Sequence, residues 1–213
     1  MQKRSQIHYR DPLAIHRLTR SISEFLEPAV DRMIAVLCIG TDRATGDALG
    51  PLVGRTLSQL RLPIKVYGSV KDPVGANNLA ELSILLEQAG EFVIAVDASL
   101  GSVDDVGKIT VSEGPLHPGT GVGKQLPAVG NISILGCVNI GALAPMQVLQ
   151  CTRLDTVMEM SDVITYGLSS SLRRHFARYS TAARDELASL TEAQSGHGWR
   201  PLLPFALGQR TGT

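Results

Sequence analysis

Residues 33–51, MIAVLCIGTDRATGDALGP, decide the fold class that this sequence predicts. Residues 33–39 are apolar throughout and end at Gly40, a pattern typical of a strand that is buried on both faces of a sheet. A glycine-rich turn follows, and residues 48–60 have helical character, with Pro51 in the first turn, where proline is tolerated. A strand, a turn and a helix in this order indicate the first unit of a parallel α/β sheet.

The same alternation of strands and helices continues on both sides of this stretch. Further strands are predicted at residues 64–70, 92–96, 107–111 and 132–138. Helices are predicted at 13–26, 77–89, 145–175 (one long or two short helices, with the serines 169–171 as a candidate end) and 182–193. We therefore expect a three-layer α/β/α fold around a mostly parallel, doubly wound sheet of about five strands.

The predicted organisation is one α/β domain with an extension at each end. We assign residues 1–31 to an N-terminal helical extension, 32–176 to the α/β domain, and 177–213 to a weakly structured C-terminal tail. A core of about 150 residues buries roughly 68–70% of its unfolded surface, so the domain does not depend on disulfides. The three cysteines form no C-x-x-C motif and two lie in apolar runs, which favours buried free thiols in a reducing cytoplasm.

Composition and charge exclude several classes of protein. Twenty Lys and Arg residues balance twenty Asp and Glu, whereas a general nucleic-acid-binding protein carries a basic surplus. No apolar run approaches the roughly 20 residues that span a bilayer, and the N-terminus lacks the apolar core of a secretory signal. We therefore expect a cytoplasmic protein with no membrane or nucleic-acid partner.

The charges are not evenly distributed along the chain. Residues 33–169 have a net charge of −5, and the segments before and after them are basic.

Two aspartates of the acidic middle are the strongest candidates for chemistry. Asp47 lies where the helix after the first strand begins, and Asp97 ends the apolar strand 92–96. In a doubly wound sheet of strand order 2-1-3, these two strands are neighbours and diverge at a crevice. Two carboxyls at that crevice repel each other, so the pKa of one rises and the pair can share a proton. Such a pair can activate water for acyl hydrolysis or ligate a divalent metal. The alternative for Asp47 alone is a helix N-cap.

Four further polar residues are candidates for substrate binding. Asp42 lies in the same turn as Asp47, and Asn77 follows the second strand; bracing the turn and capping the next helix are their alternative roles. The glycine- and proline-rich loop 114–130 holds His117, which is also a candidate third metal ligand, and Lys124. Exposure to solvent is the alternative for both. No G-x-S-x-G, H-E-x-x-H or phosphate-loop motif is present.

The sequence resembles the YyaC family of sporulation proteins over about residues 36–164. The segments that carry the resemblance are GTDRATGDALGP (40–51), VYGSVKDPVGANNL (66–79), IAVDASLG (94–101), GPLHPGTGVGKQLPAVG (114–130) and VNIGALAPMQVLQCTRLDTVMEMSDVI (138–164). This family is similar to the germination protease of spore-forming bacteria and, more distantly, to hydrogenase maturation endopeptidases. The resemblance implies their phosphorylase/hydrolase-like α/β fold.

The resemblance also implies a function. It matches Asp47 and Asp97 to the two aspartates on which germination protease depends. The implied activity is that of an aspartate-dependent endopeptidase of sporulation or germination, which hydrolyses a protein or peptide substrate and requires no cofactor. One alternative is a non-catalytic sporulation protein that binds a partner through the same crevice. The other is a nickel-dependent peptidase of the hydrogenase-maturation type, with Asp47, Asp97 and His117 at the metal. A homo-oligomer is compatible with all three.

Overall fold

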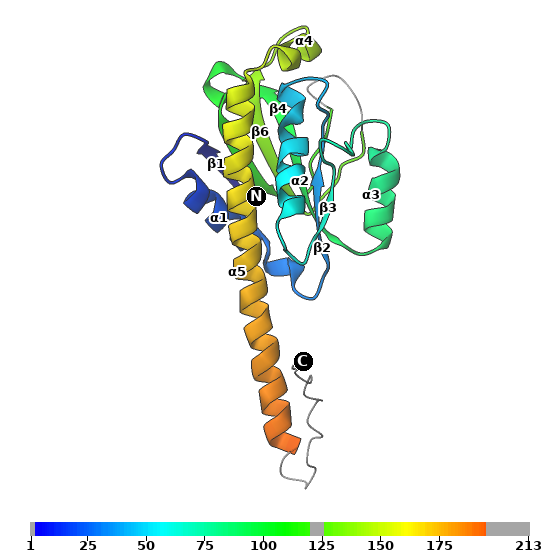
Figure 1. Cartoon of the computed structure of the whole chain (residues 1–213), viewed down its shortest axis with the longest axis vertical. Coiled ribbons are helices and arrows are strands. Elements are labelled where there is room, and N and C mark those ends of the chain that lie inside the picture. The colour runs from blue at the N-terminus through cyan, green and yellow to red at the C-terminus, as the bar shows by residue number, and fades with distance from the viewer. Residues whose placement is uncertain (1–2, 120–125, 195–213) are drawn as a thin grey trace, which may run out of the picture. The chain divides into compact units, whose positions relative to one another are not determined.

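The computed structural model describes residues 3–119 and 126–194, with side chains as far as residue 179. The chain divides into two compact units, Met1–His175 and Phe176–Thr213. The first unit holds the whole sheet (Figure 1). Among the helices of the described ranges, none combines the length and the apolar character that crossing a bilayer requires.

The described elements follow the predicted alternation closely. The strands are β1 (Arg4–His8), β2 (Ile34–Cys38), β3 (Lys65–Tyr67), β4 (Phe92–Gly101), β5 (Lys108–Glu113) and β6 (Ile132–Ile140). The helices are α1 (Ala14–Phe25), α2 (Leu49–Gln59), α3 (Leu79–Gln88), α4 (Pro145–Gln150) and α5 (Leu154–Gln194), with short 3₁₀ helices η1 (Glu27–Ala29), η2 (Gly46–Ala48) and η3 (Val103–Asp105).

The fold is α/β, with one mixed six-stranded sheet of order β1-β5-β6-β4-β2-β3. β2 pairs in parallel with β3 and β4, and β4 pairs in parallel with β6. These pairings confirm the β–α–β–α–β unit and the predicted adjacency of its first and third strands. β5 pairs antiparallel with both β6 and β1.

Two features of the sheet differ from the sequence-based prediction, and each has a physical reason. The connection from β4 to β5 spans only residues 102–107, which is too short for the crossover of a dozen or more residues that parallel strands need. β5 therefore runs in the opposite direction. β1, at the edge of the sheet, was not predicted, because only Ile7 among its five residues is buried and the apolar alternation is weak. Residues 1–31 thus contribute both a strand and a helix to the first unit.

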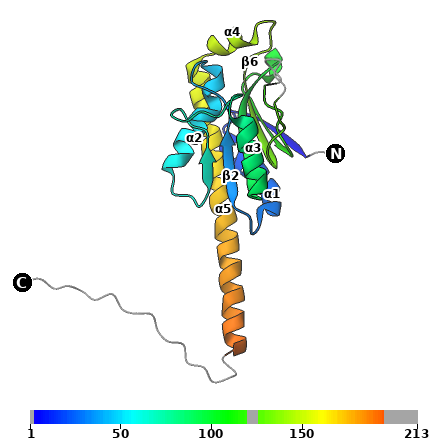
Figure 2. The ribbon, with the colours of Figure 1, turned by 90° about the vertical axis from the view of Figure 1, so that its right-hand side faces the viewer.

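β2 lies at the centre of the core, and different helices cover its two sides. Leu37 joins an apolar cluster with Leu79 and Leu86 of α3. On the other side α2 approaches closely, since a Cβ added at Gly54 would lie 3.2 Å from the Cβ of Cys38. Figure 2 shows β2 between α2 and α3. The candidate site lies beyond the carboxyl end of β2, in the turn that leads to α2.

The region predicted as one long or two short helices forms two, α4 and α5. The serines 169–171 do not end the second, because α5 continues through them. The Ser171 hydroxyl donates hydrogen bonds to the carbonyl oxygens of Gly167, one turn earlier in α5, and of Thr19 in α1. A serine that bonds to the helix backbone in this way does not interrupt the helix. Leu172 beside it is fully buried, so packing in the first unit also favours the helical path.

Candidate active site

Asp97 lies within β4 and not at its end, which corrects the sequence-based placement. β2 ends at Cys38, the partner of Val96, whereas β4 continues to Gly101 in parallel pairing with β6. Asp97 is therefore the first residue of β4 beyond the reach of β2. The prediction stopped at Val96 because Asp97 breaks the apolar run, but pairing with β6 carries the strand further. The Asp97 side chain is buried, with 7% of the residue exposed.

Asp47 lies in η2, the 3₁₀ turn that links β2 to α2, and is partly buried. Its Oδ2 accepts a hydrogen bond of 2.8 Å from the backbone N–H of Thr41. The N-cap position of α2 is Ala48, so Asp47 is not the cap of that helix. Gly40 makes this turn possible, because its φ is +131° and an added Cβ would overlap the carbonyl oxygen of Asp47.

The two carboxyls are electrostatically coupled. Burial raises the pKa of Asp97 well above its usual value, and the negative charge of Asp47 raises it further. A hydrogen bond of 2.8 Å from the N–H of Ala98 to Asp97 Oδ1 offsets only part of this rise. The structure thus brings Asp47 and Asp97, which are fifty residues apart in sequence, close to each other. Because its pKa is raised, Asp97 keeps its proton at a pH at which an exposed aspartate is ionised.

A second layer of contacts fixes the turn that carries Asp47. A Cβ added at Gly46 would press on Leu149 and on the Thr152 hydroxyl, so η2 packs tightly against the junction of α4 and α5. The Thr152 hydroxyl donates to the carbonyl oxygen of Val148, and Asn139, near the end of β6, donates to both of these oxygens. These supporting residues were not predicted as part of the site, although they lie in one of the segments that carry the family resemblance.

Asp42 and Asn77 lie together, but at a different opening. Both are exposed and line a cavity of about 550 Å³ between the β2–η2 turn and the loop before α3. Asp47 and Asp97 are not among its lining residues. Asn78, next to Asn77, holds the loop before α3: it accepts from the N–H of Gly75 and donates to the Pro73 carbonyl.

Of the two loop candidates, only His117 lies in the described part of the chain. His117 is exposed, and Lys124 lies outside the described residues. Within residues 3–119 and 126–194, no group of three His, Cys, Asp or Glu side chains could hold a metal ion. The predicted ligand set of Asp47, Asp97 and His117 is therefore not assembled there.

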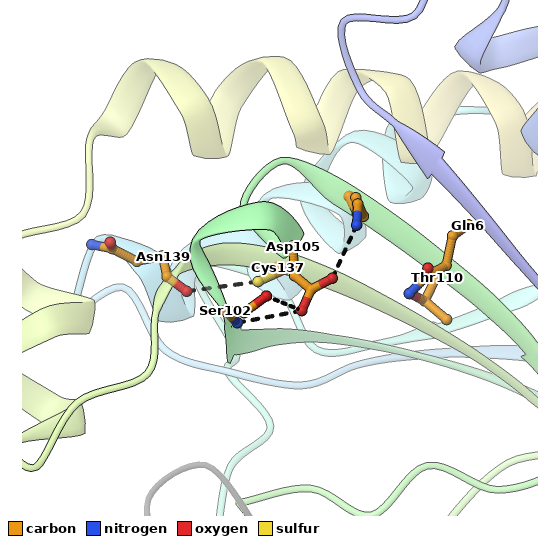
Figure 3. Close-up of polar contacts among 7 residues, drawn as sticks. Gln6, Ser102, Asp105, Thr110, Cys137 and Asn139 are labelled. Carbon is orange, nitrogen blue, oxygen red and sulfur yellow. Dashed lines mark hydrogen bonds and ion pairs between the residues drawn. The ribbon is translucent and has the colours of Figure 1, made fainter.

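A polar cluster that the sequence analysis missed lies where β4 turns into β5 (Figure 3). Asp105 accepts hydrogen bonds from the hydroxyl of Ser102 at 2.6 Å and from the Lys108 ammonium at 3.1 Å. These partners lower the pKa of Asp105 to about 2. The Cys137 thiol of β6 donates to the Asn139 carbonyl, and burial, together with the charge of Asp105, raises its pKa. The capping pattern S-x-x-D at residues 102–105 is the signal that could have revealed the turn.

Comparisons with known proteins assign the chain to a family. The family described as "Protein of unknown function (DUF1256)" matches residues 6–167. The chain belongs to the DUF1256 family. The "Uncharacterized protein YyaC" of Bacillus subtilis (strain 168) is 45% identical to it over 166 residues, which cover 76% of this chain and 81% of that protein. The expected resemblance to YyaC is confirmed.

The DUF1256 match begins within β1 and ends within α5. It therefore includes both aspartates and the η2 turn, together with α1 and part of β1, which precede the predicted domain. The second compact unit, from Phe176 onward, lies outside the match.

Proposed function

We propose that this protein is an aspartate-dependent endopeptidase in which Asp47 and Asp97 activate water to hydrolyse a peptide bond. The observation that carries the proposal is the buried carboxyl of Asp97, whose pKa is raised by burial and by the charge of Asp47. Neighbouring carboxyls with separated pKa values are the arrangement that two-aspartate hydrolases use.

In the proposed mechanism the two carboxyls have different roles. Asp47, oriented by the Thr41 N–H, accepts a proton from water as the water oxygen attacks the peptide carbonyl carbon. Asp97, which retains its proton, donates it to the leaving amide nitrogen as the C–N bond breaks. One water is consumed, and the products are a carboxyl and an amine. Asp47 then carries the proton and Asp97 is ionised, so a proton that passes from Asp47 to Asp97 restores the pair for another cycle.

The wider setting of the proposal comes from the family resemblance. We infer from it that the substrate is a protein or peptide, such as a spore protein, in the cytoplasm of a spore or sporulating cell. It also implies a three-layer, doubly wound arrangement of the phosphorylase/hydrolase-like type. The parallel order of β3, β2, β4 and β6 supports that arrangement over this part of the sheet. No cofactor takes part in the proposed step, and the nickel-dependent alternative lacks an assembled third ligand in the described residues.

The test is cleavage of a degenerate fluorogenic peptide library by the purified full chain. We expect Asp47→Asn and Asp97→Asn each to slow cleavage at least about 100-fold, as loss of a general acid or base does. Asp104→Asn is the control, because Asp104 is an exposed aspartate of η3, and it should retain the wild-type rate. Undiminished cleavage by the two site variants would contradict the mechanism. A wild-type chain that cleaves no peptide would contradict the endopeptidase proposal and favour a partner-binding role.

A further inference from the structure

β1 is an edge strand, and within the described residues it pairs with a strand on one side only. It stands first in the sheet order β1-β5-β6-β4-β2-β3, next to β5. The free side of an edge strand presents a row of backbone N–H and C=O groups that can pair with another chain. β5 and β6 separate β1 from β4, so this edge is distinct from the proposed active site.

The hydrogen bonds between β1 and β5 show which residues bond inward. The Tyr9 N–H donates to the Gly107 carbonyl, and the Glu113 N–H donates to the Lys3 carbonyl. In an antiparallel pair, residues that bond to the partner strand alternate with residues whose backbone groups point away from it. The odd-numbered residues of β1 therefore bond to β5, and the even-numbered residues direct their backbone groups to the free side.

The outward groups form a short, accessible row. Arg4 and Gln6 each present one donor and one acceptor on the free side, and both residues are exposed. The row ends at His8, because its carbonyl accepts a hydrogen bond of 2.9 Å from the N–H of Asp11. Two outward residues with one residue between them have the spacing at which an added antiparallel strand forms hydrogen-bonded pairs.

A groove lies between this edge and α1. It has a volume of about 840 Å³ and is lined by residues of both elements. The buried side chains of Ile7 and Phe25 are among them. Four lining residues recur at a spacing of three or four and therefore share one face of α1: Arg17, Arg20, Ser21 and Glu24. The groove thus offers a wall of side chains beside the open backbone of β1.

The groove is basic. One lining residue, Glu24, is acidic, and four are basic: Lys3, Arg4, Arg17 and Arg20. Arg17 pairs with Asp11 at 2.7 Å and Arg20 with Glu24 at 3.1 Å, but the two arginine side chains remain 57% and 77% exposed. Lys3 and Arg4 form no ion pair within the part of the chain that the structure describes. An acidic partner is therefore complementary to this surface.

We propose that β1 and this groove bind an acidic, extended segment of a partner protein, which joins the sheet as a further strand beside β1. The backbone of the segment bonds to Arg4 and Gln6, and its acidic side chains lie toward the basic side chains of the groove. Phosphate oxygens accept hydrogen bonds but donate none, so a nucleic-acid backbone would leave the outward carbonyls unsatisfied. A second copy of this chain is disfavoured, because pairing of two β1 strands brings like charges together.

The probe is a fluorescein-labelled nine-residue peptide of alternating Glu and Val, titrated into the full chain and followed by fluorescence anisotropy. We expect saturable binding that weakens as salt is added, and no binding when Lys replaces Glu in the peptide. A probe that is N-methylated at alternate residues keeps its charge but loses backbone donors, and should bind at least about fivefold more weakly. Bound probe should also slow hydrogen exchange at the N–H of Gln6.

Two variants of the chain test the two parts of the surface. Gln6→Pro removes an outward N–H but no bond to β5, a position at which an edge strand tolerates proline, and should weaken binding at least about fivefold. The charge variant Lys3→Glu with Arg20→Glu should weaken it at least about tenfold. Arg55→Glu is the matched control, because Arg55 is an exposed arginine of α2, and should change the affinity less than about twofold.

The charge variant keeps the test decisive if Gln6→Pro does not fold. Unchanged affinity in the charge variant, equal binding of the N-methylated probe, or displacement of the probe by an equal concentration of oligothymidylate would each overturn the proposal. A wild-type dimer that becomes a monomer in Gln6→Pro would also overturn it, because the edge would then pair two copies. Asp97→Asn should bind the probe as wild type does, so this proposal stands or fails separately from the endopeptidase.

Discussion

The negative charge of Asp47 raises the pKa of the buried Asp97 carboxyl, although the two residues are fifty positions apart in the chain. This coupling arises because β2 ends at Cys38 while β4 continues past it. The turn after β2 carries Asp47, and Asp97 is the first residue of β4 beyond the end of β2.

The coupling predicts the effect of removing one charge. Asp47→Asn should lower the pKa of Asp97, because a like charge that penalises ionisation is lost, while the contribution of burial remains. The measurement is the titration of the Asp97 carboxyl carbon by ¹³C NMR. Asp42→Asn serves as the control and should leave that titration unchanged. A pKa of Asp97 that does not move in Asp47→Asn would show that the two carboxyls are not coupled.

The raised pKa of Asp97 also predicts a dependence of stability on pH. In the unfolded chain Asp97 ionises near 3.8, and in the folded protein it does so at a higher pH. Its contribution to stability is therefore fully present below the unfolded pKa and is lost as the pH rises through the folded pKa. Asp97→Asn removes this loss and should raise the free energy of unfolding relative to wild type more at pH 8 than at pH 4. Urea unfolding at the two pH values measures the difference, and equal effects of the substitution at both would contradict the assignment.

Much of the fold follows from local sequence patterns. The apolar run 33–39 and the helical pattern at 77–89 predicted their elements to within two residues at each end, because burial on both faces and a polar helix start are local signals. β1 and the full length of β4 could not be predicted, since both depend on pairing with distant strands.

The same distinction applies to the candidate site. The two aspartates could be selected because the order of strands brings them together. The supporting role of Asn139 and Thr152 could not be predicted, because their hydrogen bonds depend on how α4 folds back on β6. Lys124 remains a prediction outside the described residues, and the roles of Asp42, Asn77 and His117 in substrate binding remain predictions as well.

Gly40 should be a sensitive position for both stability and activity. Gly40→Ala forces a side chain into a positive-φ turn and against the Asp47 carbonyl, so we expect a loss of about 1–3 kcal/mol of unfolding free energy. Gly75→Ala is the matched control, because nothing lies within 4 Å of an added Cβ there. Urea unfolding of the two variants compares them. A Gly40→Ala protein as stable as Gly75→Ala would show that this close approach does not exist.

The three cysteines should differ in reactivity. Cys151 is exposed, whereas Cys38 and Cys137 are buried, and burial raises the pKa of both buried thiols. Because the thiolate is the reactive form, one thiol should react quickly with an aromatic disulfide reagent in the native protein and all three in urea. Cys151→Ser should remove the fast phase. A fast phase that persists in this variant would place one of the other two thiols at the surface.

The pH dependence of peptide cleavage tests the central claim most directly. If Asp97 is the proton donor, the cleavage rate falls as the pH rises through the pKa of Asp97, and the midpoint of that fall coincides with the midpoint of its ¹³C titration. The account also predicts that Asp47→Asn, measured in the same way, cleaves at least about 100-fold more slowly at every pH. A rate that stays constant across the titration of Asp97, or a wild-type rate in Asp97→Asn, would contradict it.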